Sequence, residues 1–308
     1  MNNRVLFGVN LPQASLEAAP TASQIVEFAK LAEDFRFHSL WVLERILHHT
    51  VSVLDPLSLL TFSSAVTREP KLGTAIVMTP LRNPVLLAKM ISTMDNLSSG
   101  RLILGIAVGG DQVEFDAVGI KLTERAARFA ENLRIMRELW SGNRVSYQGR
   151  FWTLKEASMK PQPIQKNLPI WIGGRADDAL KRAVKYADGW IGSGASSFKQ
   201  FEESWRAITG FIQEAGKPSS DFIATKRLYT HVDPDPDWAE STMKKWMTSF
   251  YGGRISDISQ TCVYGPIEHC VETIQRYVDA GAKVLILHPV HDHLNQLRTY
   301  GSQIIPSF

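Results

Sequence analysis

The chain has 308 residues, of which 44% are hydrophobic and 21% are charged. This composition supports an ordinary globular core and excludes an intrinsically disordered chain. The formal net charge is only +3 and the charged residues are scattered along the sequence. We therefore expect neither a nucleic acid nor an anionic membrane surface as a partner.

Cysteine content and the length of the apolar runs bear on the compartment. Cys262 and Cys270 are too few to staple a chain of this length, so we expect reduced thiols and a cytoplasmic protein. The first apolar stretch is broken by Asn10 and Pro12 and is too short for a signal peptide. The longest apolar run, residues 102–108, is far shorter than the ~20 residues of a membrane helix, and we expect no membrane span.

Short apolar runs rich in β-branched residues alternate with longer amphipathic stretches, which is the pattern of parallel strands joined by crossover helices. We predict strands at residues 5–10, 39–43, 72–78, 102–107, 170–172, 189–191, 222–232 and 284–287. We predict helices at residues 22–35, 56–66, 84–97, 124–140, 177–186, 198–215, 237–250, 267–279 and 292–304.

Residues 143–168 interrupt this alternation. Two short apolar runs, Val145–Tyr147 and Phe151–Leu154, flank a Gln-Gly turn and predict a small hairpin. Pro161 and Pro163 indicate an extended segment after it. We expect an insertion at about residues 143–168 within a single domain that spans residues 1–308.

Eight strand–helix units in about 300 residues predict a (β/α)₈ TIM barrel of the α/β class, with insertion segments at its carboxyl rim. An open, doubly wound sheet is the alternative fold. Such a sheet usually carries a Gly-x-Gly-x-x-Gly turn after its first strand, whereas this chain has Asn-Leu-Pro-Gln at residues 10–13. In a barrel the functional residues follow the carboxyl ends of the strands, so the residues after each apolar run are the candidates.

Glycine-bearing turns follow the fifth and sixth predicted strands. Glycine lets an anion approach backbone N–H groups, and a helix N-terminus adds partial positive charge. Either turn alone could be a tight strand-to-helix connection without a ligand. Two such turns in neighbouring positions predict a binding site for a phosphorylated cofactor. The candidate residues are Gly173, Gly174, Arg175, Gly192, Ser193 and Gly194.

Several segments spread over most of the chain form a specific set, although each alone would be a weak signal. They are Leu40-Trp41-Val42, residues 72–77, Arg82-Asn83-Pro84-Val85, residues 97–110, Ile172-Gly173-Gly174 and residues 186–190. As a set they resemble the luciferase-like superfamily of barrel enzymes, which bind FMN or the deazaflavin F420.

The resemblance implies where a cofactor would bind. Relatives carry a non-proline cis peptide bond in the third strand that presses on the middle ring of the cofactor. The matching bond here is Ala75-Ile76, directly after Thr74. The resemblance also implies that Gly109 and Gly110 lie near the ring system, and that the first glycine turn contacts the cofactor phosphate.

Glu44 and Arg45 follow the second strand, where many F420-dependent relatives have an acid followed by a histidine. Arginine is always charged and cannot act as a general base. It can instead pair with a substrate carboxylate or with the electron-rich edge of a reduced deazaflavin. Glu44 either titrates or holds Arg45 in an ion pair. Both are candidate catalytic residues.

Polar side chains after other strands are candidates for a substrate pocket, namely Asn10, His48 and His288. His288, His291 and His293 also have the chemistry of zinc ligands. Metal-dependent hydrolase barrels usually draw a further histidine pair from the first strand, and the first strand here has none. We therefore predict no metal site. Separately, we expect loops 44–55, 108–123 and 252–266 to cover the cavity at the barrel rim.

The leading hypothesis is an F420-dependent oxidoreductase that moves hydride between the deazaflavin and a small organic substrate. The alternative is an FMN-dependent monooxygenase that uses oxygen and receives reduced flavin from a separate flavin reductase. A barrel that binds a flavin without catalysis is a hypothesis of another class, and a metal-dependent hydrolase is the least favoured. Apolar residues on the helices beyond the needs of the barrel indicate a homodimer.

Overall fold

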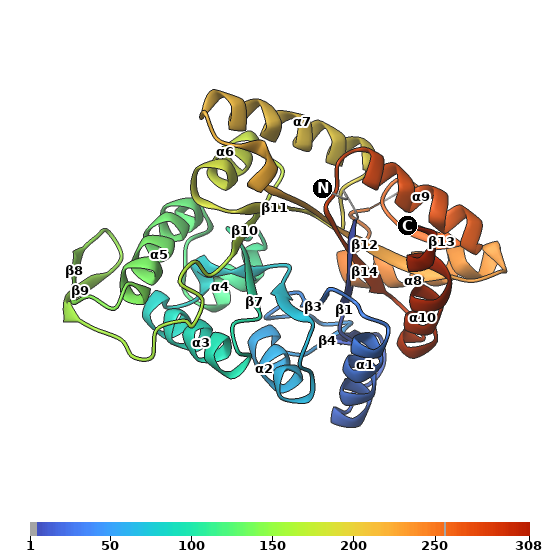
Figure 1. Ribbon diagram of the computed structural model, residues 1–308, viewed down its shortest axis with the longest axis horizontal. Coiled ribbons are helices and arrows are strands. Elements are labelled where there is room, and N and C mark those ends of the chain that lie inside the picture. The colour runs from blue at the N-terminus through green and yellow to red at the C-terminus, as the bar shows by residue number, and fades with distance from the viewer. Residues whose placement is uncertain (1–4, 256) are drawn as a thin grey trace.

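The computed structural model describes residues 5–255 and 257–308, and in this part of the chain parallel strands close into a barrel (Figure 1). β7 pairs with β10, and β14 pairs with β1, so the sheet has no open edge. The predicted (β/α)₈ barrel is confirmed, and the alternative of an open sheet is wrong. In spatial order the barrel strands are β1 (Leu6–Asn10), β3 (Ser39–Val42), β5 (Lys71–Thr74) with β6 (Val77–Met78), β7 (Leu102–Ala107), β10 (Ile170–Gly173), β11 (Gly189–Gly192), β12 (Ile223–Val232) and β14 (Val284–Pro289).

Helices surround the barrel, and their starts follow local sequence signals. Asp55 Oδ1 accepts the Ser58 amide at 2.8 Å, and Pro56 occupies the first helical turn, where its missing N–H costs nothing. Asn83 and Pro84 repeat this arrangement at the next helix. The helices are α1 (Ala22–Asp34), α2 (Pro56–Val66), α3 (Pro84–Leu97), α4 (Gln112–Ala117), α5 (Arg125–Trp140), α6 (Asp177–Tyr186), α7 (Phe198–Glu214), α8 (Pro236–Tyr251), α9 (Ile267–Asp279) and α10 (His293–Thr299).

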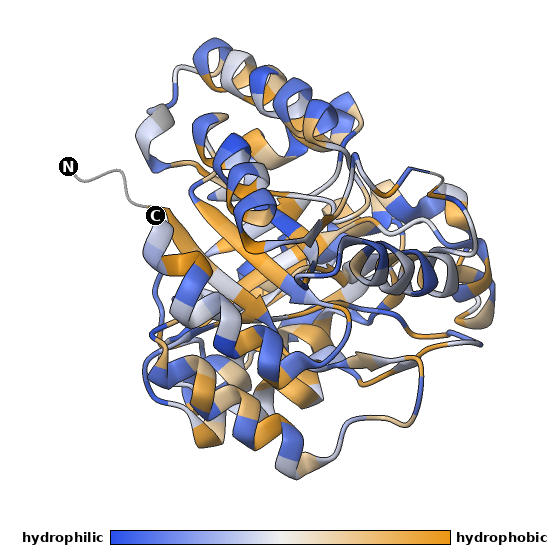
Figure 2. Ribbon diagram, turned by 90° about the vertical axis from the view of Figure 1, so that its right-hand side faces the viewer, coloured by the Kyte–Doolittle hydropathy of each residue, from blue (hydrophilic) through white to orange (hydrophobic). Residues whose placement is uncertain are grey.

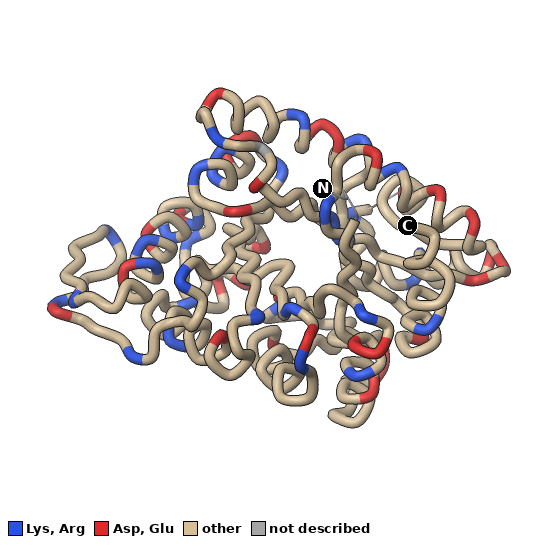
Figure 3. The backbone as a smooth tube through the Cα atoms, viewed as in Figure 1, with Lys and Arg blue, Asp and Glu red and all other residues tan. Residues whose placement is uncertain are grey.

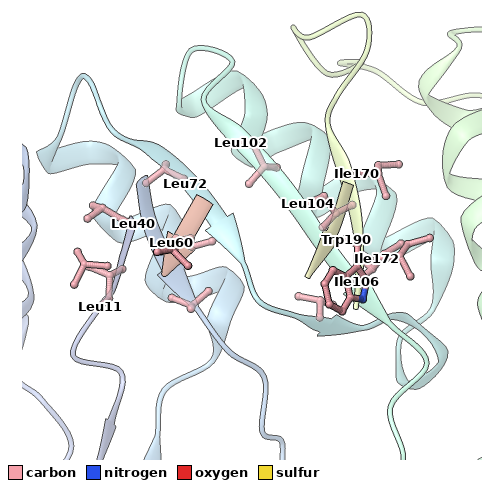
Figure 4. Close-up of a cluster of buried hydrophobic side chains, with 14 of the residues drawn as sticks. Leu11, Leu40, Leu60, Leu72, Leu102, Leu104, Ile106, Ile170, Ile172 and Trp190 are labelled. Atoms are coloured by element: carbon pink, nitrogen blue, oxygen red, sulfur yellow. The ribbon is translucent and has the colours of Figure 1, made fainter. Parts of the chain in front are cut away.

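Both faces of the barrel strands are packed. Leucine and isoleucine side chains such as Leu40, Leu72 and Leu104 form one large buried cluster together with helix residues such as Leu60 (Figure 4). A second cluster fills the barrel interior, where Trp41 stacks on Trp171 with ring centroids 5.4 Å apart. Because this second cluster fills the interior, a ligand can bind at the rim of the barrel and not inside it.

The third barrel strand departs from the prediction of one continuous strand over residues 72–78. It is divided into β5 and β6, and the peptide bond between Ala75 and Ile76 at the division is cis. Gly105 of β7 allows this arrangement, because a Cβ atom there would lie 1.8 Å from the Thr74 carbonyl oxygen. The cis bond lies where the family resemblance implies it.

The sequence prediction found one short hairpin and missed several other short elements. β8 (Val145–Gln148) and β9 (Thr153–Ala157) form the antiparallel hairpin expected within residues 143–168. The Glu131 carboxylate accepts the amides of Phe151 and Trp152 and so fixes the hairpin on α5. The unpredicted elements are α4, β13 (Val263–Gly265), and the antiparallel pair of β2 (Ala14–Ser15) and β4 (Ser52–Val53).

The surface is polar and of mixed charge. Hydrophobic residues concentrate in the central strands, whereas the surrounding helices carry both hydrophilic and hydrophobic residues (Figure 2). Acidic and basic residues are spread over these helices without separating into regions of one sign (Figure 3). Among the described helices none is both long enough and apolar enough to cross a membrane.

Candidate active site

A cavity of about 940 Å³ opens at the carboxyl rim of the barrel. Its volume is that of a site for a cofactor or a sizeable small molecule. The three loops expected to roof it all contribute lining residues, including Arg45, Asp111 and Arg254. Residue 256 of the third loop lies outside the described residues.

The β5–β6 junction forms one wall of this cavity. Ala75 and Ile76 line it directly. Thr74 fixes the segment from behind, because its hydroxyl donates to the Gly105 carbonyl at 2.7 Å and accepts the Gly105 amide at 2.9 Å. A rigid, apolar surface therefore faces the cavity at this point.

Glu44 follows β3 and is almost completely buried. Its carboxylate accepts the Met78 amide and the Arg82 guanidinium, with Arg82 Nε at 2.8 Å from Oε1. Burial raises the pKa of Glu44, and the charge of Arg82 and the two sets of hydrogen bonds act in the opposite direction. Because these partners use both carboxylate oxygens, Glu44 ties β3 to β6 and does not hold Arg45.

Arg45 pairs with acids from the loop after β7. Its Nη1 lies 2.8 Å from Asp111 Oδ2 and 3.5 Å from Glu114 Oε2. Burial lowers the pKa of Arg45, but the hydrogen bond to Asp111 and the charge of Glu114 more than offset this, so the pKa lies above its usual value. Two carboxylates thus neutralise the guanidinium before any ligand binds.

The part of the cavity formed by the loops after β10 and β11 is suited to an anion. Gly174 and Arg175 line it just before the N-terminus of α6, and Ser193 lines it in the loop after β11. Within the described residues, Arg175 makes no ion pair, and the amides of Ser193 and Gly194 have no protein acceptor. Free backbone amides and an unpaired arginine are groups that can bind an anion.

A chain of hydrogen bonds reaches the cavity from the barrel interior. Arg227 donates to the Ala75 carbonyl at 3.1 Å and to the Tyr229 hydroxyl at 3.3 Å, and the Tyr229 and Tyr251 hydroxyls lie 2.9 Å apart. Arginine can only donate. Tyr229 is fully buried, and among residues 5–255 and 257–308 Tyr251 is the one acceptor within reach of its proton. An unused buried O–H is costly, so Tyr229 donates to Tyr251. The O–H of Tyr251 is then free to face the cavity that Tyr251 lines.

The structure brings many of the residues proposed from the sequence to the cavity surface and leaves others behind it. Thr74, Gly173, Gly192 and Gly194 belong to the same strands and turns but are not among the lining residues. Those that line it are Glu44, Arg45, Ala75, Ile76, Gly109, Gly110, Gly174, Arg175 and Ser193.

The residues proposed for a substrate pocket do not line the cavity. Asn10 is buried, and its amide donates to the Leu11 carbonyl. His288 is buried behind Tyr229, with ring centroids 4.7 Å apart. His48 lines a separate depression of about 300 Å³ and contacts the Phe250 carbonyl at 3.2 Å. Phe250 and Tyr251 of α8 line the cavity instead.

Arg227 and Tyr251 are two of the lining residues that sequence reasoning missed. Arg227 carries a usable signal, since an ionisable side chain inside a strand that is buried on both faces must find polar partners or a ligand. Tyr251 carries none, because its place depends on how the C-terminal end of α8, 22 residues after Tyr229, packs against Tyr229. His288, His291 and His293 do not converge: the described residues contain no group of three or more metal-ligating side chains that could hold a metal ion.

A closed parallel barrel with a large cavity at its carboxyl rim has the architecture of a ligand-binding (β/α)₈-barrel enzyme. A family model described as luciferase-like monooxygenase matches residues 5–255. The chain belongs to this family.

Curated relatives align over most of the chain. It is 28% identical to an F420-dependent glucose-6-phosphate dehydrogenase from Microbacterium testaceum, over 92% of this chain and 93% of the relative. It is 31% identical to a 5,10-methylenetetrahydromethanopterin reductase from Archaeoglobus fulgidus, over 70% of this chain and 63% of the relative.

Solved structures share the fold at lower sequence identity. An F420-dependent secondary alcohol dehydrogenase in complex with an F420-acetone adduct superposes with a TM-score of 0.86 at 20% identity, covering 98% of both chains. The monooxygenase RslO1 from Streptomyces bottropensis superposes with a TM-score of 0.84 at 21% identity, covering 98% of this chain and 99% of the other.

Proposed function

We propose that this protein is an F420-dependent oxidoreductase that transfers hydride between the deazaflavin and a small organic substrate. The observation that carries the proposal is the rim cavity, which joins an anion-binding end to the wall formed by Ala75 and Ile76. The F420-dependent relatives, which align over most of the chain, support the choice of this cofactor.

Some residues that line the cavity would contact the cofactor, and others would contact the substrate. Gly174, Arg175 and Ser193 would hold the cofactor phosphate, and Ala75, Ile76, Gly109 and Gly110 would lie along its ring. F420 supplies the acceptor or donor for hydride, and the protein orients it. The loops that roof the cavity, with Arg45, Asp111 and Arg254, would contact the substrate.

Tyr251 is our proposal for the group that contacts the reacting oxygen of the substrate. Its O–H faces the cavity because Arg227 and Tyr229 set the direction of the hydrogen-bond chain. A hydroxyl in this position can donate to a carbonyl oxygen or exchange a proton with an alcohol. It takes over the role that the resemblance assigns to a histidine, which Arg45 cannot perform because it is a permanent cation engaged by Asp111.

An FMN-dependent monooxygenase supplied by a separate flavin reductase is the second candidate. The same anion-binding end accepts the phosphate of FMN, and the fold shared with RslO1 favours keeping this candidate in the test. A barrel that binds a flavin without catalysis is the third.

Titration of the purified protein with F420 and with FMN separates these candidates. We expect saturable F420 binding and oxygen-independent reduction of F420, followed by its absorbance, with at least one compound from a panel of glucose 6-phosphate, 2-propanol and other secondary alcohols. Turnover that requires both reduced FMN and oxygen would replace the first candidate with the second. Saturable binding with no turnover of any compound would favour the non-catalytic barrel.

We further propose a cytoplasmic homodimer. Leu86, Met90 and Leu97 form an exposed apolar stripe along α3, and Phe62 is exposed on the adjacent α2. Apolar side chains at this spacing lie on one helix face, and a contiguous exposed apolar patch is typical of a protein interface. The free thiols of Cys262 and Cys270 suit a reducing compartment.

A further inference from the structure

Lys226 of β12 is a fully buried lysine beside the anion-binding end of the cavity. Successive residues of a strand point to opposite faces, so Arg227 points into the barrel while Lys226 points outward, under the loop that follows β11. Its Nζ donates to the carbonyl oxygens of Ser193 at 2.5 Å and Ser196 at 2.7 Å, and to the Ser196 hydroxyl at 2.9 Å. All three donor positions of the ammonium group are thus used by one short loop.

These three hydrogen bonds determine which way the loop presents its backbone. The carbonyl groups of Ser193 and Ser196 turn toward Lys226, away from the cavity. The amides of Ser193 and Gly194 have no protein acceptor, and Ser193, Ala195 and Ser197 line the cavity. A loop whose carbonyls are turned inward and whose amides remain free can accept an anion.

No carboxylate pairs with Lys226 in the described part of the chain. The groups that face it are Arg227 on its own strand, Arg175 from the loop before α6, the Cys262 thiol, and the Tyr277 ring of α9 at 5.7 Å. Two of these are cations and none is a carboxylate. A buried charge requires a compensating partner, so the protein alone leaves this position short of one negative charge.

We propose that Lys226 is the positioning residue of the phosphate subsite: it holds loop 193–197 in its anion-accepting conformation, and its buried charge is balanced by the phosphate of the bound cofactor. This inference rests on the proposed function, and it assigns a role to a side chain that does not reach the cavity itself. Arg175, which lines the cavity, would contact the phosphate directly, whereas Lys226 would act through the loop.

A change in protonation follows from the same arrangement. Burial, followed by the charges of Arg227 and Arg175, lowers the pKa of Lys226 to about 7. A nearby anion favours the charged form and raises this pKa. Above pH 7, phosphate binding therefore takes up a proton, and affinity falls as the pH rises. Below pH 7 the lysine is already charged, so affinity no longer depends on this group.

A comparison of F420 with its phosphate-free deazaflavin riboside tests the inference. Lys226→Met should weaken F420 binding roughly 10- to 100-fold, as expected for losing hydrogen bonds from a charged group, and should change riboside binding little. Lys217→Met is the matched control, because Lys217 also donates to a carbonyl, that of Val184, but lies away from the loop. Fluorescence titration gives both affinities. Equal weakening of both ligands, or of neither, would overturn the role of Lys226.

The wild-type protein provides a second measurement that does not depend on how the variant folds. Calorimetric titration at pH 8 in two buffers of different ionisation enthalpy should show proton uptake with F420 and none with the riboside. Absence of uptake with F420 would contradict the inference while leaving the proposed function intact. If the protein binds FMN in place of F420, the FMN and riboflavin pair applies the same test. Binding of neither phosphorylated ligand would overturn the proposed function together with the inference.

Discussion

Arginines line the cavity on several sides, but they differ in how much of their charge a ligand can use. Asp111 Oδ2 accepts a hydrogen bond from Arg45 at 2.8 Å and lies 3.7 Å from Arg254 Nη2. The positive charges of these two guanidinium groups are therefore already compensated. Arg227 donates only to neutral oxygens, and Arg175 makes no ion pair in the described chain. Anionic groups of a ligand are therefore expected near Arg175 and Arg227, and not near Arg45, the residue that the sequence pattern favoured.

Removal of the Tyr251 hydroxyl tests the direction of the hydrogen-bond chain. In Tyr251→Phe, turnover of an alcohol or sugar substrate should fall by about 10²-fold or more, the usual contribution of a positioned acid or base. The dissociation constant of F420 should change little, because the ring of the side chain remains. Tyr186→Phe, on α6, is the matched control. If Tyr251→Phe keeps wild-type turnover in steady-state assays, Tyr251 has no role at the reacting oxygen.

At the scale of elements, the strands and helices of the barrel could be predicted, whereas the short elements could not. Barrel strands bury continuous apolar runs, and helices such as α2 begin with a cap residue and proline, so each leaves a local signal. β2, β4 and β13 are two or three residues long, and α4 has six. Elements of this length are stabilised by tertiary contacts, which no local pattern records.

Replacing a glycine by alanine should have opposite effects on stability in β7 and in α7. A Cβ atom on Gly105 would lie 1.8 Å from the Thr74 carbonyl oxygen and 2.7 Å from Ile191, so Gly105→Ala should destabilise the fold by about 1–3 kcal/mol or more through overpacking. It should also weaken cofactor binding, because Thr74 supports the wall formed by Ala75. A Cβ atom on Gly210, within α7, would meet nothing within 4 Å.

The matched substitution Gly210→Ala should therefore stabilise the protein, by up to about 1 kcal/mol from the difference in helix propensity. Urea unfolding of both variants gives the two free energies of unfolding. Equal stability of Gly105→Ala and the wild type would show that β7 and the β5–β6 junction are not in the close contact described.

At the scale of the whole molecule, closure of the barrel brings residues from distant parts of the sequence to one rim. Glu44, Gly109, Gly174 and Ser193 each follow a different barrel strand and all line one cavity. This is why candidates could be chosen from the carboxyl ends of predicted strands alone. Topology does not specify which helix covers the rim. Tyr251 was therefore missed. His288, proposed because it follows the predicted strand 284–287, lies within β14, packs against the Tyr229 ring and is not among the residues that line the cavity.

The outer surface leads to a prediction about assembly. Leu86 and Leu97 are 65% and 60% exposed on one face of α3, so burying that stripe against a second copy would remove apolar area from water. Leu86→Glu would place a charge in this contact. We expect the variant to elute as a monomer in size-exclusion chromatography with light scattering while its circular dichroism spectrum stays that of the wild type. Trp238→Glu, at an exposed aromatic residue of α8, should leave the dimer intact. A dimer that survives Leu86→Glu but is lost with Trp238→Glu would place the interface on α8, and a wild-type monomer would refute the homodimer.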